Sequence, residues 1–174
     1  MPLSANDIRR AFAALSEELA AHDRHGDIVI VGGAALVLLY EARASTKDVD
    51  AYFVSPEAAI LRTAAEAVAT KLDLPGDWLN DGAKGYLVGV TTGEVLYESP
   101  TLTVRAASTP QLLAMKLAAW RDTIDREDAK LLLSHLHGSA GEIWAMVAPF
   151  VPVHQLDKAS YAFEDLWEAL HGHP

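Results

Sequence analysis

The chain has 174 residues, of which 51% are hydrophobic and 22% charged, so it can bury one core with at most a helical appendage. Its 14 Lys+Arg against 24 Asp+Glu give a net charge of −10, which argues against a broad basic face for nucleic acid. The absence of cysteine excludes disulfides and thiolate chemistry. No apolar run suits a membrane span or a signal peptide, so we expect a cytoplasmic protein.

The first half of the chain alternates helices with short strands. Ser4 and Asp7 have the spacing of a capping box and open an amphipathic helix. Gly32-Gly33 turns a buried strand into an almost wholly apolar helix, and Ser55-Pro56-Glu57 is typical of a helix start. The expected helices cover residues 4–22, 34–42 and 55–72, and the expected strands residues 27–31 and 47–54.

The second half begins with a loop, WLNDGAKG (78–85), and continues with short strands and then helices. Strands are expected over 86–90, 95–98 and 102–105, the first two joined around Thr92-Gly93. Helices are expected over 110–121, 125–137, 139–148 and 155–171. The fold class is therefore α+β. We expect a mixed sheet of four or five strands flanked by helices in residues 1–108, and a helical region in 109–174 packed on it.

The stretch TKDVDAYF places two carboxylates one residue apart inside an apolar run. If it is a strand, alternation puts Asp48 and Asp50 on one face, with their Cα atoms about 6.6 Å apart. Two carboxylates that close favour a hard divalent cation between them, since oxygen ligands suit Mg²⁺ or Mn²⁺. The alternative is a hydrated face of the sheet, because open water also relieves the repulsion.

Gly32-Gly33 lies where a strand meets the N-terminus of a helix. Free backbone N–H groups and the helix dipole favour a phosphate there, and glycine lets the anion approach the backbone. The alternative is that the pair only serves backbone geometry. Together with Asp48 and Asp50 on the next strand, it provides a phosphate site beside a metal site, which suits attack on a nucleoside triphosphate.

The run VGGAALVLLYEARASTKDVDAYF (31–53) resembles the polymerase-β type of the nucleotidyltransferase superfamily. Further runs, WLNDGAKGYL, LTVRAASTPQLLAMKLAAWR and DREDAKLLL, look like small bacterial nucleotidyltransferase-like proteins related to the AbiEii toxins. The resemblance spans roughly residues 27–137. It implies that Gly32 and Gly33 contact the triphosphate, and that Asp48 and Asp50 are catalytic and bind magnesium.

The sequence departs from this pattern at two points. Many active members of the superfamily have Ser or Thr after the glycines, whereas this chain has Ala34. The superfamily's third carboxylate, on a later strand, has no clear counterpart, because the strand LTVRAAS provides Arg105 and no acid. Candidates for that third carboxylate are Glu94, Glu98 and Asp81.

Residues outside the glycines and acids also enter the predicted site. By resemblance, Lys116 faces the active site and contacts phosphates; the alternative is a lysine whose amine reaches the surface. Asn80 and Lys84, in the WLNDGAKG loop, are candidates for gripping a nucleotide or an acceptor, or are solvated neighbours of an anchoring Trp78. Downstream, three charged residues read better as an ion-pair network than as catalysts: Arg121, Asp125 and Asp128.

The sequence thus favours a magnesium-dependent nucleotidyltransferase that transfers NMP from a nucleoside triphosphate to an acceptor hydroxyl. The acceptor is RNA (tRNA ends in particular), a protein or a small molecule, and the resemblance implies a toxin–antitoxin or phage-defence role with a cognate protein partner. The alternative is a catalytically weak nucleotide-binding or antitoxin-like module with the same fold. No membrane partner is expected, and the N-terminal helix is a candidate homodimer surface.

Overall fold

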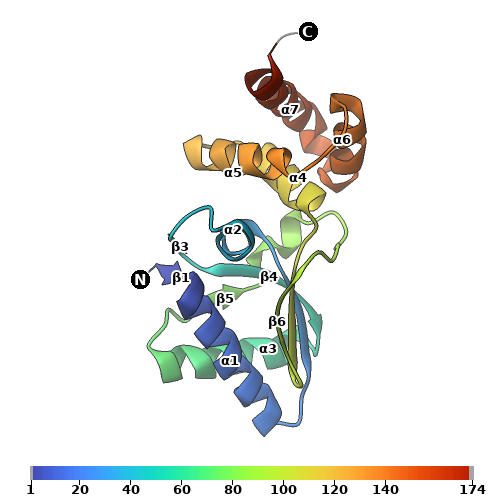
Figure 1. Cartoon of the computed structure of the whole chain (residues 1–174). Helices are drawn as coiled ribbons and strands as arrows, with labels where there is room; N and C mark the ends of the chain where they lie inside the picture. Colours follow the sequence, from blue (N-terminus) through green and yellow to red (C-terminus); the bar gives the residue numbers. More distant parts are fainter. Residues whose placement is uncertain (1, 173–174) are drawn as a thin grey trace. The chain divides into compact units, whose positions relative to one another are not determined.

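The computed structural model describes residues 2–172, which form two compact units (Figure 1). The first comprises the residues up to Gly85 together with Thr92–Ala107. The second comprises Tyr86–Thr91 and the residues from Ser108 onward. Within residues 2–172, none of the helices has the length and apolar character needed to cross a membrane.

The first unit is built on a mixed five-stranded sheet in the order β5-β4-β2-β7-β6. Strand β2 pairs antiparallel with β4 and parallel with β7, β4 is parallel to β5, and β6 is antiparallel to β7. This confirms the predicted α+β class and strand number. The strands are β2 (Gly26–Ile30), β4 (Val49–Ser55), β5 (Leu79–Asn80), β6 (Val95–Ser99) and β7 (Leu102–Ala106).

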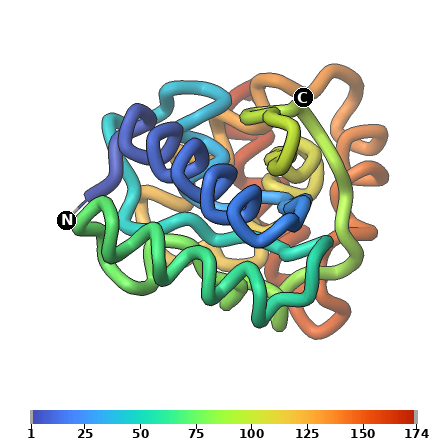
Figure 2. Tube along the Cα trace, turned by 90° about the horizontal axis from the view of Figure 1, so that it is seen from below, coloured from blue at the N-terminus to red at the C-terminus, as the bar shows by residue number. Residues whose placement is uncertain are grey.

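Helices α1 (Ala5–Ala21) and α3 (Ala58–Leu72) cover one face of this sheet and lie side by side (Figure 2). The predicted capping box is present, since the Ser4 hydroxyl accepts from the Asp7 N–H and the Asp7 carboxylate accepts from the Ser4 N–H. Fully buried Phe12 of α1 contacts the rings of Trp78 and Tyr97, with centroids 6.3 and 6.0 Å away. This aromatic packing fixes α1 against the sheet.

The other face of the sheet carries polar side chains. Along β4, Val49 and Ala51 are buried, whereas Asp50 and Tyr52 are half-buried, as expected for alternating directions. Helix α2 (Gly32–Tyr40) follows β2 and packs against β4. A two-residue ladder joins the N-terminus, β1 (Leu3–Ser4), to β3 (Ser45–Thr46), which precedes β4.

The second unit contains four helices with short 3₁₀ turns between the last two. Side chains cap the N-termini of three of them, from Ser108, Asp122 and Ser139. Lys158 donates to the carbonyls of Ala118 and Ala119 at 2.9 and 2.7 Å, and so caps the C-terminus of α4. The helices are α4 (Thr109–Ala119), α5 (Thr123–Ser134), α6 (Ala140–Val147) and α7 (Leu156–His171).

Several predicted boundaries were wrong for identifiable reasons. Residues 86–90 form no strand, and the hairpin is β6–β7, so the expected turn at Thr92-Gly93 is a connection into β6. The predicted loop 78–85 contains β5 and the 3₁₀ helix η1 (Gly82–Tyr86), because β5 completes the sheet edge beside β4. The N-cap residue of helix α3 is Glu57, without a side-chain hydrogen bond, and Ser55 is still in β4, because that strand runs longer than its apolar residues indicate.

Candidate active site at the turn from β2 to α2

The turn between β2 and α2 has the features of an anion site. The Val31 N–H donates to the Asp50 carbonyl at 2.9 Å, and Gly32 then takes a left-handed conformation with φ +64°. Helix α2 has no side-chain cap and no acidic residue in its first turn. Its first N–H groups and its positive dipole end are therefore available to a negatively charged ligand.

Three side chains gather around this turn. The Asp50 Oδ2 lies 3.2 Å from where a Cβ on Gly32 would stand. A Cβ on Gly33 would stand 2.9 Å from the Thr46 Oγ1 and 3.8 Å from an Arg43 guanidinium nitrogen. Gly32 is therefore needed for its backbone conformation and for close approach, and Gly33 for close approach. The Asp50 carboxylate faces the Gly32-Gly33 turn, so the two halves of the predicted site come together.

Asp48 lies just outside the strand, contrary to the prediction. After β3 the chain bends at Lys47, and the ladder resumes only at Val49, whose N–H donates to the Trp78 carbonyl at 2.7 Å. Asp48 is half-buried and stands two residues before Asp50 in the chain. Two carboxylates fit Mg²⁺ when substrate phosphates and waters complete the shell, so this donor set is compatible with the ion the resemblance implies.

Of the two strands beside β4, β5 carries no acid, and β2 carries one on this face, Asp27. In register, Val29 lies opposite Arg105, so Arg105 shares the Asp50 face, and its guanidinium pairs with Asp27 at 2.9 Å. Among residues 2–172, no three His, Asp or Glu side chains are grouped in a way that could hold a metal ion. The acid on this face of β2, Asp27, is thus already paired with an arginine of β7.

The three candidates for a third carboxylate are either paired with another side chain or far from Asp50. Glu98 pairs with Thr103, which lies opposite Asp27. Glu98 therefore lies at the other end of the sheet from Asp50, about 13 Å away measured along β2. Glu94 stands next to β7, three strands from β4 and about 14 Å away. Asp81 accepts two hydrogen bonds from Arg62, at 2.6 and 3.2 Å, and these bonds hold the pKa of Asp81 below its ordinary value.

The WLNDGAKG loop brings Asn80 next to the candidate site. Asn80 lies opposite Asp50 in the parallel β4–β5 ladder, so both side chains leave the same face. The Asn80 amide oxygen accepts from the Gly82 N–H at 2.9 Å and thereby shapes the start of η1. Lys84 is exposed on η1, and its role as a nucleotide-binding residue stays a prediction.

Lys116 belongs to the second unit and forms part of an ion-pair network there. Its Nζ contacts the carboxylates of Asp125 at 3.0 Å and Asp128 at 2.7 Å, and the three side chains are 13%, 3% and 7% exposed. Arg121 lies in the break between α4 and α5, not on a continuous helical stripe, and pairs with Asp125 at 3.2 Å. The predicted network is present; a phosphate-binding role for Lys116 stays a prediction.

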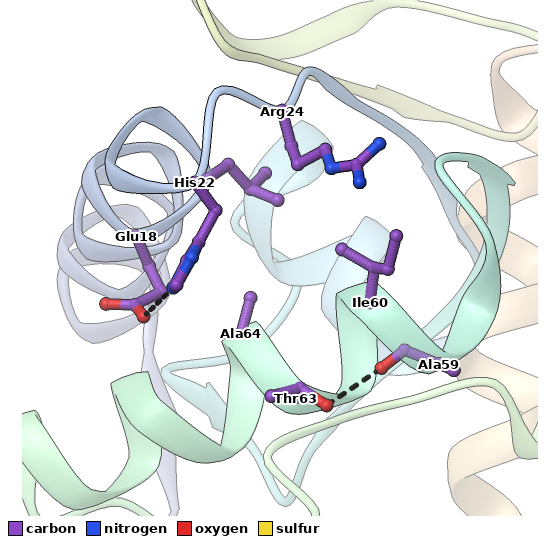
Figure 3. Close-up of a pocket in the computed structure, with 8 residues that line it drawn as sticks. Glu18, His22, Arg24, Ala59, Ile60, Thr63 and Ala64 are labelled. Atoms are coloured by element: carbon purple, nitrogen blue, oxygen red, sulfur yellow. Dashed lines mark hydrogen bonds and ion pairs between the residues drawn. The ribbon is translucent and has the colours of Figure 1, made fainter.

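A separate cavity of about 380 Å³ lies between α1 and α3 (Figure 3). Its floor is apolar, and at its rim His22 pairs with Glu18 at 3.3 Å while Arg24 stands nearby. These helices cover the sheet face opposite Asp50, so the cavity is not part of the candidate site.

Residues 7–89 match the model of a nucleotidyltransferase family of unknown function (DUF6036). This confirms the nucleotidyltransferase resemblance over the segment that carries Gly32, Gly33, Asp48, Asp50 and Lys84; Lys116 lies outside it. Searches of curated proteins and of solved structures gave no significant match.

Sequence reasoning missed two side chains at the turn, Arg43 and Thr46. The alternation that puts Asp48 and Asp50 on one face also puts Thr46 there, yet nothing in the local pattern gives Thr46 a role. Its position became evident only through the β1–β3 ladder, a pairing of residues more than forty positions apart. Two-residue strands carry no periodicity that a sequence pattern can detect.

Proposed function

We propose that this chain is a Mg²⁺-dependent nucleotidyltransferase that moves an NMP group from a nucleoside triphosphate to an acceptor hydroxyl. The observation that carries the proposal is the Asp50 carboxylate beside Gly32, at the uncapped N-terminus of α2. It lies within the segment that matches a nucleotidyltransferase family. An anion site and a cation-binding carboxylate are thereby adjacent, as a metal-bound triphosphate requires.

In this proposal the free N–H groups at the start of α2 bind the triphosphate. Asp48 and Asp50 would hold the divalent cation, which when bound neutralises charge on the phosphates. The acceptor oxygen forms a bond to the α-phosphorus, the bond from that phosphorus to the β-phosphate oxygen breaks, and pyrophosphate leaves. The acceptor proton passes to solvent water, and positioning and electrostatics supply most of the acceleration.

The acceptor we favour is a small molecule, a protein side chain or a short RNA end such as that of tRNA, because the net charge of −10 disfavours a long nucleic-acid footprint. We extend the proposal to a cytoplasmic toxin–antitoxin or phage-defence component with a cognate protein partner. We also propose that two copies of the chain form a homodimer through α1.

The test is transfer of label from each of the four α-labelled nucleoside triphosphates to cell extract with Mg²⁺. Wild type should label an acceptor, and Asp48→Asn and Asp50→Asn should not. The control is Glu98→Gln, which changes an exposed acid at the far end of the same face and should retain transfer. Equal labelling by Asp50→Asn would refute the assignment.

One observation favours a second candidate, a nucleotide-binding or antitoxin-like module without strong transferase activity. The strand where a third acid is expected carries Arg105, paired with Asp27. Metal-dependent nucleotide binding without any label transfer would support this module, and turnover would exclude it.

A further inference from the structure

The turn that should hold the triphosphate has no hydroxyl from its own helix. Ala34, where many nucleotidyltransferases have Ser or Thr, is 1% exposed, so a side chain at this position points into the core. The N-cap residue, Val31, has no polar side chain, and α2 has no side-chain cap. Any hydroxyl that contacts a ligand here must come from another element.

Thr46 of β3 places a hydroxyl at this point. Its Oγ1 stands 2.9 Å from the Cβ position of Gly33, the second residue of α2. The side chain is half-buried, and it has no hydrogen-bond or ion-pair partner among residues 2–172. An uncommitted hydroxyl beside uncapped helix N–H groups can donate to an anion without breaking an existing bond.

Two features restrict the position of Thr46, its pairing in the β1–β3 ladder and its β-branched side chain. It pairs with Leu3 in the β1–β3 ladder, and Leu3 is 1% exposed, so the N-terminal strand anchors the segment. Threonine is also β-branched, which restricts its χ1 angle and reduces the entropy lost when its hydroxyl binds. The hydroxyl is therefore held in place before any ligand arrives.

We propose that Thr46 binds the triphosphate through its hydroxyl, in place of the hydroxyl that position 34 does not supply. This inference rests on the proposed function, because it assigns one contact within the same site. The ligand chemistry is a polyphosphate whose oxygen accepts from Oγ1 while the N–H groups of α2 bind the same group. The N-terminal strand thus contributes to nucleotide binding although it does not touch the ligand.

The experiment compares Thr46→Val, which keeps the shape without the hydroxyl, with Thr46→Ser, which keeps the hydroxyl. Thr63→Val is the matched control, because that exposed threonine on α3 donates only to the Ala59 carbonyl. Calorimetry measures binding of inorganic triphosphate and of each nucleoside triphosphate with Mg²⁺. A hydrogen bond to a charged group predicts an affinity loss of roughly 10- to 100-fold for Thr46→Val. Thr46→Ser should stay within about threefold of wild type, and Thr63→Val should be unchanged.

The outcomes separate the two proposals. If wild type binds, Asp50→Asn does not, and Thr46→Val binds as wild type does, the role of Thr46 is overturned while the proposed function stands. Thr46→Ser as weak as Thr46→Val also overturns it, since the hydroxyl is then not the cause. If wild type binds no polyphosphate, both fail. Thermal melting of each variant establishes that the fold is kept.

Discussion

Replacing Lys116 by methionine tests how the second unit is held together. The substitution keeps the length of the side chain but removes the ammonium that Asp125 and Asp128 share. Both carboxylates are less than a tenth exposed, so they lose a partner without gaining water. Breaking a buried pair by removing one member costs about 3 kcal/mol or more. We use the lower figure, because Arg121 still bonds Asp125 through its backbone N–H and its guanidinium.

The assay is urea unfolding, followed by circular dichroism, at neutral pH. The matched control is Lys71→Met, which removes a pair with Glu17 whose two side chains are 57% and 69% exposed. Exposed pairs of this kind contribute little, so its unfolding midpoint should match that of wild type. A Lys116→Met midpoint equal to that of Lys71→Met would refute the reasoning, since the network would then not stabilise the unit.

The pH dependence gives a second readout of the same substitution. In wild type, burial raises the pKa of Asp125, but hydrogen bonds from Lys116 and the Arg121 backbone outweigh it, so the pKa lies below its ordinary value. That contribution is present above the ordinary carboxyl pKa and is lost as pH falls through the lowered one. Without the Lys116 ammonium, Asp125 loses one of the hydrogen bonds that lower its pKa, so its carboxylate takes up a proton at a higher pH than in wild type. The stability difference between wild type and Lys116→Met should therefore shrink as pH falls.

Further predictions concern the first unit. Gly33→Ala puts a methyl 2.9 Å from the Thr46 hydroxyl. It should lower nucleotide affinity about tenfold, measured by calorimetry, and the free energy of unfolding by about 1 kcal/mol, measured in urea. Wild-type values for both quantities would contradict the close approach. Trp78→Phe loses the indole N–H bond to a carbonyl of α3 and should cost about 1–2 kcal/mol in urea unfolding, and an unchanged midpoint would contradict it. Arg62→Gln should move the NMR-measured pKa of Asp81 up toward its ordinary value, and no movement would show that Arg62 is not the cause.

The fold was largely predictable from the sequence because most helices carry their own start signals and apolar periodicity. The Ser4–Asp7 capping box marked α1, and the apolar run after Gly32-Gly33 marked α2. Elements defined by pairing with distant residues were not predictable. Strand β5 has two residues and forms only because β4 offers an edge, and an apolar stretch at 86–90 was mistaken for a strand.

The sequence predicted that Asp50 and Gly32 meet in the candidate site, but not the other side chains that lie there. Alternation and the Gly-Gly turn indicated that Asp50 and Gly32 would meet, and the structure places them together. The contribution of Thr46 depends on a ladder with the N-terminus, which no local pattern contains. For Lys116 the sequence indicated a need for a partner but not which partner it has. A lysine in an apolar helix needs a partner, and the sequence left open a phosphate contact or an amine at the surface, whereas the structure pairs Lys116 with two carboxylates.

Mg²⁺-dependent binding of nucleoside triphosphates to wild type, Asp50→Asn and Glu98→Gln, measured by calorimetry, tests the central claim most directly. Wild type and Glu98→Gln should bind one nucleotide with equal affinity, and binding should disappear without Mg²⁺. Asp50→Asn should bind at least about 100-fold more weakly, because a neutral amide no longer attracts the cation. Equal affinity in all three proteins, or no binding by wild type to any of the four nucleotides, would contradict the proposed function.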